Sequence, residues 1–212
     1  MPPPTDRGAP TREVSPNLDR PQPQPSPPGL GEHVGPAALV AMLLAGLGLR
    51  GETYRRVSAD PGATHHCLAA TVLGAVAYGL CVSRRIDLAP PLLVVVEIVR
   101  ATATLLVESG IVWGLGRWML GREVPFASVL RPLALAGAPG LLFALAAIPQ
   151  AEAAVAVGVP VWLLTAFVLA IRSALDVSWP RAIGLALGVW LVEALPGAML
   201  GFVGPPSTPT AG

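Results

Sequence analysis

The chain is poor in charged residues. Only 13% of its 212 residues are Asp, Glu, Lys or Arg, about half of the roughly 25% found in soluble domains. Lysine is absent, so all fourteen basic residues are arginine, and the formal net charge is +1. Such a balance supplies no basic stripe that could follow a phosphate backbone, and we expect no nucleic acid among the partners.

Residue patterns that mark common catalytic sites are also missing. The chain has no HExxH zinc-protease motif, no GxSxG nucleophile elbow and no P-loop. The stretch His65-His66-Cys67 resembles a metal cluster. Neighbouring helix residues point about 100° apart, however, so these side chains do not converge on one ion. We expect no enzyme activity, no cofactor and no metal site.

Cysteine is scarce as well, with only Cys67 and Cys81. Fourteen residues of straight helix would separate them by about 21 Å, whereas a disulfide needs Cα atoms less than about 7 Å apart. We expect two free thiols.

Long apolar runs dominate what remains, and 53% of the residues are hydrophobic. A bilayer core of about 30 Å requires roughly 20 mostly apolar residues per helix. The sequence therefore predicts an all-α, polytopic membrane protein in contact with the lipid bilayer. We expect a bundle of five transmembrane helices at about residues 61–82, 92–114 (with an extension to Met119 as an alternative), 133–149, 153–171 and 182–203. Asp60 and Pro61 suit the cap and first position of the first span.

Residues 33–203 form the predicted transmembrane domain, and two tails flank it. Ten of the 24 prolines lie in the first 30 residues, which predicts a disordered, Pro-rich tail over residues 1–32. That tail could alternatively dock on an SH3-like or WW-like partner. Residues 204–212 form a short uncharged tail.

The apolar segment Gly35–Leu49 is shorter than the five predicted spans. Its 15 residues would reach about 23 Å as a helix, less than the hydrocarbon thickness, and several arginines follow it. We expect an N-terminal interfacial helix; a sixth span is the competing interpretation.

Proline and glycine patterns suggest close helix packing. Pro139, Pro160 and Pro196 each fall inside a predicted span, where proline removes a backbone hydrogen bond and kinks the helix. Glycines four residues apart let helix backbones approach one another, and three such pairs occur: Gly110/Gly114, Gly184/Gly188 and Gly197/Gly201.

Arginine placement predicts the orientation. With five spans, eleven arginines fall on the side of the N-terminus and only Arg84 and Arg85 on the other. Under the positive-inside rule the N-terminus is then cytoplasmic and the C-terminus is outside. We expect a bacterial cell membrane, with Trp118 and Trp179 at its inner interface.

Four charged residues fall within predicted spans: Glu97, Arg100, Glu108 and Glu193. Glu97 and Glu108 lie about 20° apart on the helical wheel, and Arg100 lies about 60° from Glu97. Arg100 would lie about 13 Å from the outer edge and Glu193 about 17 Å from the inner edge, so both are near the midplane. Because intramembrane charges normally have partners, we predict an Arg100–Glu193 pair. It serves as a structural clasp or, alternatively, as part of a proton or ion path.

Three stretches carry a family resemblance: TYRRVSADPGAT at 53–64, VPFASVLRPLALAGAPGLLFALAAIP at 124–149, and VWLLTAFVLAIRSALDVSWPRAIGLAL at 161–187. Together they resemble the bacterial branch of the YIP (Ypt-interacting protein) family over about residues 50–200. The matching features are Phe126, Arg131, Ala138-Pro139, Trp162, the Arg-x-Ala-Leu-Asp turn at 172–176 and Arg181-Ala182. The resemblance implies a Yip-type domain of five spans with a cytoplasmic N-terminus. The charges of the second span are not part of the pattern.

Two functions from different classes follow. The first is a non-enzymatic scaffold or adaptor of YIP type, which binds protein partners through helix packing or through the Pro-rich tail. The second is a small transporter or channel subunit that uses the intramembrane Arg and Glu charges.

Overall fold

The computed structural model describes residues 35–84, 89–121 and 123–202, except for the side chains at 120 and 193–202. The two predicted tails, 1–32 and 204–212, therefore lie outside the described residues. Within the described ranges every regular element is a helix. In chain order these are α1 (Pro36–Leu47), α2 (Gly51–Ala59), η1 (Pro61–Ala63), α3 (Thr64–Val82), α4 (Pro90–Leu120), α5 (Phe126–Leu135), η2 (Ala138–Ala147), η3 (Pro149–Ala151), α6 (Glu152–Leu175) and α7 (Trp179–Phe202).

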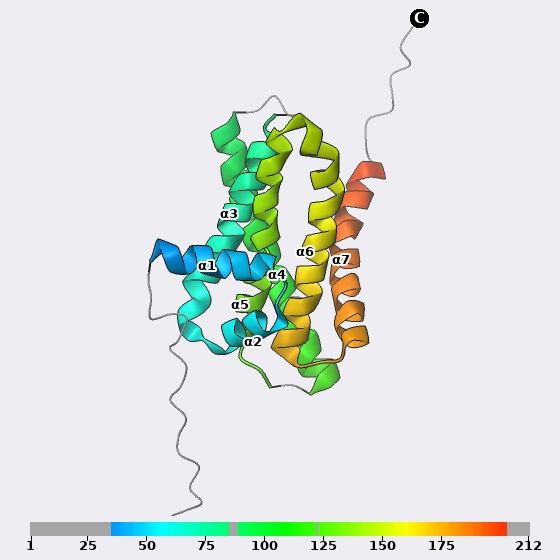
Figure 1. Cartoon of the computed structure of the whole chain (residues 1–212). Helices are drawn as coiled ribbons and strands as arrows, with labels where there is room; N and C mark the ends of the chain where they lie inside the picture. Colours follow the sequence, from blue (N-terminus) through cyan, green and yellow to red (C-terminus); the bar gives the residue numbers. More distant parts are fainter. Residues whose placement is uncertain (1–34, 85–88, 122, 203–212) are drawn as a thin grey trace, which may run out of the picture.

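Four stretches of the described chain are long and apolar enough to cross a membrane: Pro61–Val82, Pro90–Met119, Phe126–Ala147 and Pro149–Leu175. They run side by side along the bundle, and α7 lies beside α6 (Figure 1). This is the architecture of a multi-pass membrane protein. The part of α7 whose side chains are described, Trp179–Val192, is apolar but shorter than the four membrane-spanning stretches.

The first span begins as its sequence predicts. The carboxylate of Asp60 accepts a hydrogen bond from the Gly62 backbone N–H at 2.9 Å, and η1 starts at the next residue, Pro61. An acceptor at this position satisfies a backbone donor that has no partner in the first turn. The fourth apolar stretch begins at Pro149, four residues before the position expected from the sequence.

The third span differs from its prediction at both ends. It begins at Phe126 rather than near residue 133, and it ends at Ala147 rather than 149. Pro125 adopts an extended conformation that starts α5. Arg131, which lies before the predicted start of the third span, is instead buried inside α5. The polar groups that make this burial possible come from α2 and α3.

Within the third span the helix changes type. The α-helical turns of α5 end at Leu135, and η2 continues the span as a 3-10 helix from Ala138. Pro139 lies at the start of η2, where its missing N–H costs little. The break brings η2 very close to α3: a Cβ added to Gly74 would lie 2.9 Å from the carbonyl oxygen of Gly137. Glycine is needed at position 74 because the two backbones meet there.

Two of the three glycine pairs expected to mark helix contacts do not meet another helix among the described residues. A Cβ at Gly110, Gly114, Gly184 or Gly188 would meet no other atom within 4 Å. The third pair, Gly197/Gly201, lies among residues whose side chains are outside the described set. Spacing alone was misleading because it does not say which face of a helix meets a neighbour.

The N-terminal helices attach differently from the rest. In Figure 1, α1 lies across the bundle rather than along it. The Trp162 indole N–H on α6 donates to the Leu47 carbonyl oxygen at 3.2 Å, and this contact holds the end of α1. The Tyr54 hydroxyl donates to the Gly46 carbonyl oxygen at 3.3 Å. These two side chains fix where α1 ends and α2 begins.

Candidate intramembrane site

Three of the four intramembrane charges predicted from the sequence, Glu97, Arg100 and Glu108, lie on α4. Pro90 occupies the first turn, and Gly121 ends the helix in a left-handed conformation, with φ of 60°. Glycine adopts that conformation without the steric penalty of a side chain. Few residues of α4 are buried, and large apolar side chains such as Val95, Val99 and Val107 are exposed. An apolar exposed helix face of this kind suits contact with lipid.

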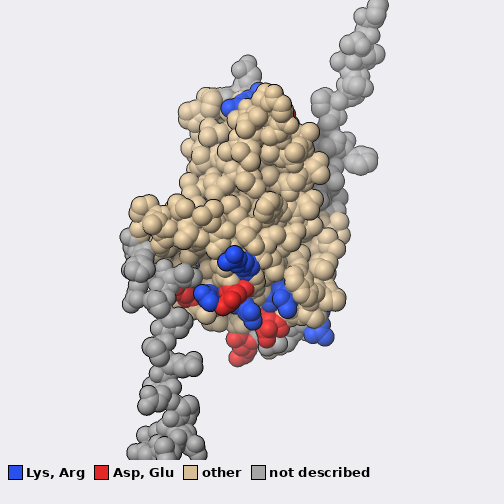
Figure 2. Space-filling view, in the orientation of Figure 1, with Lys and Arg blue, Asp and Glu red and all other residues tan. Residues whose placement is uncertain are grey.

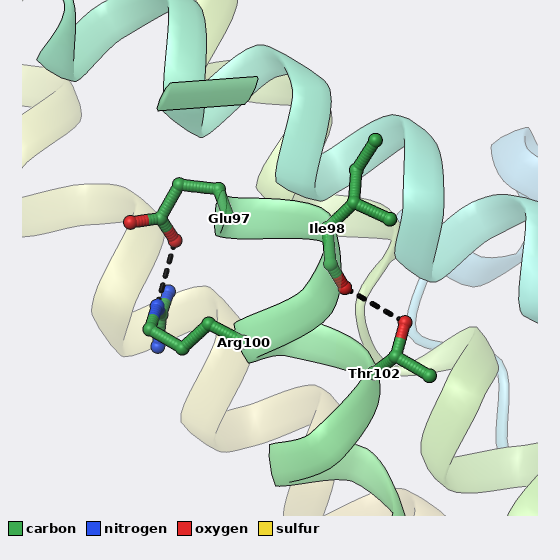
Figure 3. A network of polar contacts seen from close by, with 4 residues as sticks. All are labelled: Glu97, Ile98, Arg100 and Thr102. Atoms are coloured by element: carbon green, nitrogen blue, oxygen red, sulfur yellow. Dashed lines mark hydrogen bonds and ion pairs between the residues drawn. The ribbon is translucent and has the colours of Figure 1, made fainter. Parts of the chain in front are cut away.

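Arg100 and Glu97 form an ion pair on one face of α4. The Arg100 Nε donates to the Glu97 carboxylate at 2.7 Å, across one turn of the helix (Figure 3). The Glu97 side chain is 12% exposed and that of Arg100 is 56% exposed. The guanidinium also lies 5.7 Å from the centre of the Tyr78 ring on α3, close enough for a cation–π contact. The intramembrane arginine therefore has partners on two helices.

The predicted partner of Arg100 was Glu193 on the fifth span. The side chain of Glu193 lies outside the described residues, so this pairing stays a prediction. Trp190, three residues earlier on α7, faces a cavity that Arg100 also lines.

A partly open cavity of about 330 Å³ lies between the helices of the bundle. Polar side chains on two helices line it, and Phe167 and Trp190 provide apolar walls; the polar residues are Thr71, Arg100, Thr104 and Glu108. Concave sites with a few convergent polar groups are typical of small-ligand sites. The structure thus brings two of the predicted charges, Arg100 and Glu108, to one cavity.

The break in the third span borders this cavity. Ala136 and Gly137, between α5 and η2, are among its lining residues. The Thr71 hydroxyl donates to the Ala134 carbonyl oxygen at 3.0 Å, which satisfies a backbone acceptor near the end of α5. Non-helical backbone at membrane depth is tolerated where it is buried in protein or lines a cavity. The position of the break follows this rule.

Sequence reasoning missed the hydroxyl groups and the aromatic wall of this cavity. Thr104 lies four residues from both Arg100 and Glu108, and that helical spacing could have placed it on their face. Thr71 and Trp190 are far away in the sequence, and only the packing of α3 and α7 brings them near. No group of three metal-ligating side chains gathers anywhere in the described ranges.

A second polar cluster, centred on Arg131, joins α2, α3 and α5. The Arg131 guanidinium donates to the Ser58 carbonyl oxygen at 2.7 Å and to the Thr64 hydroxyl at 3.1 Å. The Ser58 hydroxyl in turn donates to the Ser128 carbonyl oxygen at 2.7 Å. Arg131 is only 7% exposed, so these bonds replace the water that the guanidinium loses. The cluster fixes α2 against the bundle.

Tyr54 is fully buried beside this cluster. Burial raises the pKa of its hydroxyl well above the usual value, and the neighbouring Cys67 adds to this effect. Both cysteines are free, as the sequence predicts.

Most charged side chains gather at the end of the molecule that carries α2. On the face in Figure 2 they form one group at that end, whereas the broad surface beyond it carries no charge until a basic group at the opposite end. Exposed charges of α2 contribute to the group: Glu52, Arg55 and Arg56. The distribution matches an apolar band with one strongly charged, water-facing end.

Comparisons with protein-family models, with curated proteins and with solved structures found no match to this chain.

Proposed function

We propose that this chain is a non-enzymatic membrane scaffold or adaptor of YIP type. The observation that carries the proposal is the rigid attachment of the charged helix α2. Its inner face is held by Tyr54, Val57 and Ser58, all buried, and its outer face presents charges to water. A helix fixed in this way offers a preformed surface to a protein partner, which lowers the entropic cost of association.

The proposed topology has five spans, with α7 as the fifth. The 24 residues of α7 would extend about 36 Å as a helix, enough to cross a bilayer core. The α2 end then lies on the cytoplasmic side, because arginines favour that side. Helix α1, apolar and set across the bundle, lies at the interface of the same leaflet. Reporter fusions at both termini should report opposite compartments; the same compartment for both would overturn the five-span topology.

A photo-crosslinking experiment tests the adaptor function. A photoreactive residue at position 59, an exposed uncharged position of α2, is expected to give discrete protein adducts in intact cells. The double variant Arg55→Glu, Arg56→Glu should abolish them, because the proposed surface works through its charge. The matched control Arg84→Glu changes a charge at the other end of α3 and should leave the adducts intact. Adducts that are absent, or that survive charge reversal on α2, would contradict the proposal.

The cavity that contains Arg100 and Glu108 favours a second candidate function, a small transporter or channel subunit. Intramembrane ionisable groups often mark ion or substrate pathways. Purified protein in liposomes loaded with a pH-sensitive dye would show proton flux if this function is correct. Glu108→Gln and Glu193→Gln should then reduce the flux, whereas Glu52→Gln, at the charged end, should not. Liposomes without flux would leave the adaptor as the function.

A further inference from the structure

A larger hollow lies apart from the cavity that Arg100 lines. It measures about 780 Å³ and lies between the last turns of α4 and the first turns of α7. Helices α4 and α7 make few contacts with each other, so this space forms a groove. Its apolar walls come from both helices: Leu115 and Met119 from α4, and Gly184, Leu185 and Gly188 from α7.

The two glycines make the groove deep on the α7 side. Neither Gly184 nor Gly188 has any atom within 4 Å of the place where a side chain would begin. Arg181 also lines the groove, and seven residues of helix, about 10 Å, separate it from Gly188. The groove therefore starts at a charged residue and extends roughly one third of the way through a bilayer core of about 30 Å.

The charged start of the groove has the features of a membrane interface. Trp118 and Trp179 are exposed near it, and indole rings favour the headgroup level. The Arg172 guanidinium lies 4.7 Å from the centre of the Trp179 ring. These residues place the start of the groove at the depth of lipid headgroups.

Arg181 is available to an anionic ligand. It is exposed, and within the described part of the chain it forms no hydrogen bond or ion pair. The one carboxylate that also lines the groove, Asp176, has an interaction of its own. The mouth thus presents an exposed guanidinium, a group that binds phosphate well, above apolar walls.

We propose that this groove, the α4–α7 groove, binds an anionic phospholipid of the leaflet that surrounds the α2 end. The phosphate would lie on Arg181, and an acyl chain would lie along Gly184 and Gly188. Basic pockets between transmembrane helices are known to hold anionic headgroups. A free phosphate would leave the apolar walls uncovered, and a neighbouring protein helix would not require the guanidinium. The combination of charge and apolar depth matches a lipid.

Native mass spectrometry of the full chain tests the headgroup contact. Protein in mild detergent is titrated with equal amounts of phosphatidylglycerol and phosphatidylcholine, and wild type should retain phosphatidylglycerol preferentially. Arg181→Gln should reduce that preference about fivefold, the effect of one arginine near an anionic surface. The matched control is Arg117→Gln, an exposed arginine at the same end that does not line the groove. An equal loss in both variants would overturn the proposal.

A second pair of variants tests the acyl-chain contact. Gly184→Leu fills the groove and should reduce retention of both lipids, whereas Gly110→Leu adds the same side chain to another open helix face and should not. Glycerol phosphate, which has no acyl chains, should not compete with the lipid. Competition by glycerol phosphate would show an anion site only, and a mass of two chains that disappears with Gly184→Leu would show a protein in the groove. Either result would overturn the lipid assignment.

Discussion

Replacing Arg131 by methionine should destabilise the whole bundle. Arg131 donates to the Ser58 carbonyl oxygen at 2.7 Å and to the Thr64 hydroxyl at 3.1 Å, and it is 7% exposed. Together with the bond from the Ser58 hydroxyl to the Ser128 carbonyl oxygen, these bonds join the end of α2 and the start of α3 to α5. Methionine keeps most of the apolar length of the side chain but donates no hydrogen bond.

The magnitude follows from those two bonds. A hydrogen bond from a charged group contributes about 1.5–3 kcal/mol, and the Ser58 carbonyl would be left buried without its donor. Relief of the cost of burying a guanidinium offsets part of this loss. The net decrease in the free energy of unfolding should be about 3 kcal/mol. For a chain of this size that corresponds to a decrease of about 6–12 °C in Tm.

Thermal unfolding in mild detergent, followed by circular dichroism, measures the effect. Arg117→Met is the matched control, because Arg117 is exposed and its guanidinium lies over the Trp113 ring at 6.0 Å; it should change stability by no more than about 0.5 kcal/mol. Thr64→Val removes one acceptor, and its effect should not add to that of Arg131→Met. Equal Tm shifts for Arg131→Met and Arg117→Met would refute the reasoning.

Two further predictions concern α3 and α2. Gly74→Ala places a Cβ 2.9 Å from the Gly137 carbonyl oxygen and should decrease stability by about 1–3 kcal/mol. Gly114→Ala adds a methyl group that contacts no other residue and should stabilise α4 by up to about 1 kcal/mol. A change of Tm in the same direction for both variants would contradict the packing. Burial raises the pKa of Tyr54, so the neutral hydroxyl contributes its full stability below about pH 10, the pKa of tyrosine in the unfolded chain. This contribution is lost as the pH rises above that value. Tyr54→Phe should therefore show a smaller decrease in Tm between pH 9 and pH 11 than wild type, and an unchanged decrease would count against burial of the hydroxyl.

Local signals in the sequence predicted many features of the fold. Apolar runs of membrane-spanning length identified the spans that the structure contains, and Asp60-Pro61 marked the start of the first. The separation of Cys67 and Cys81 predicted two free thiols. These features depend on residues close together in the chain, so sequence reasoning could reach them.

Predictions that depended on helix faces were less successful. The sequence placed Arg131 outside the third span, because the acceptors that allow its burial belong to α2 and α3, far away in the sequence. Glycine spacing at Gly184 and Gly188 predicted a helix contact, yet the structure has an open groove there. Glu97 and Arg100 lie on one helix face, as the helical wheel indicated, and they form an ion pair. The pairing of Arg100 with Glu193 stays a prediction.

By itself, the sequence determined that long helices form and that they are apolar enough to lie in a membrane, because hydrophobicity and helix length are local properties of the chain. Only the tertiary structure decided which polar groups meet. It brought Arg131 to Ser58, placed Thr71 and Trp190 around the Arg100 cavity, and left Arg181 above an apolar groove. These arrangements depend on how each helix is rotated and broken, which is decided by packing between segments distant in the chain.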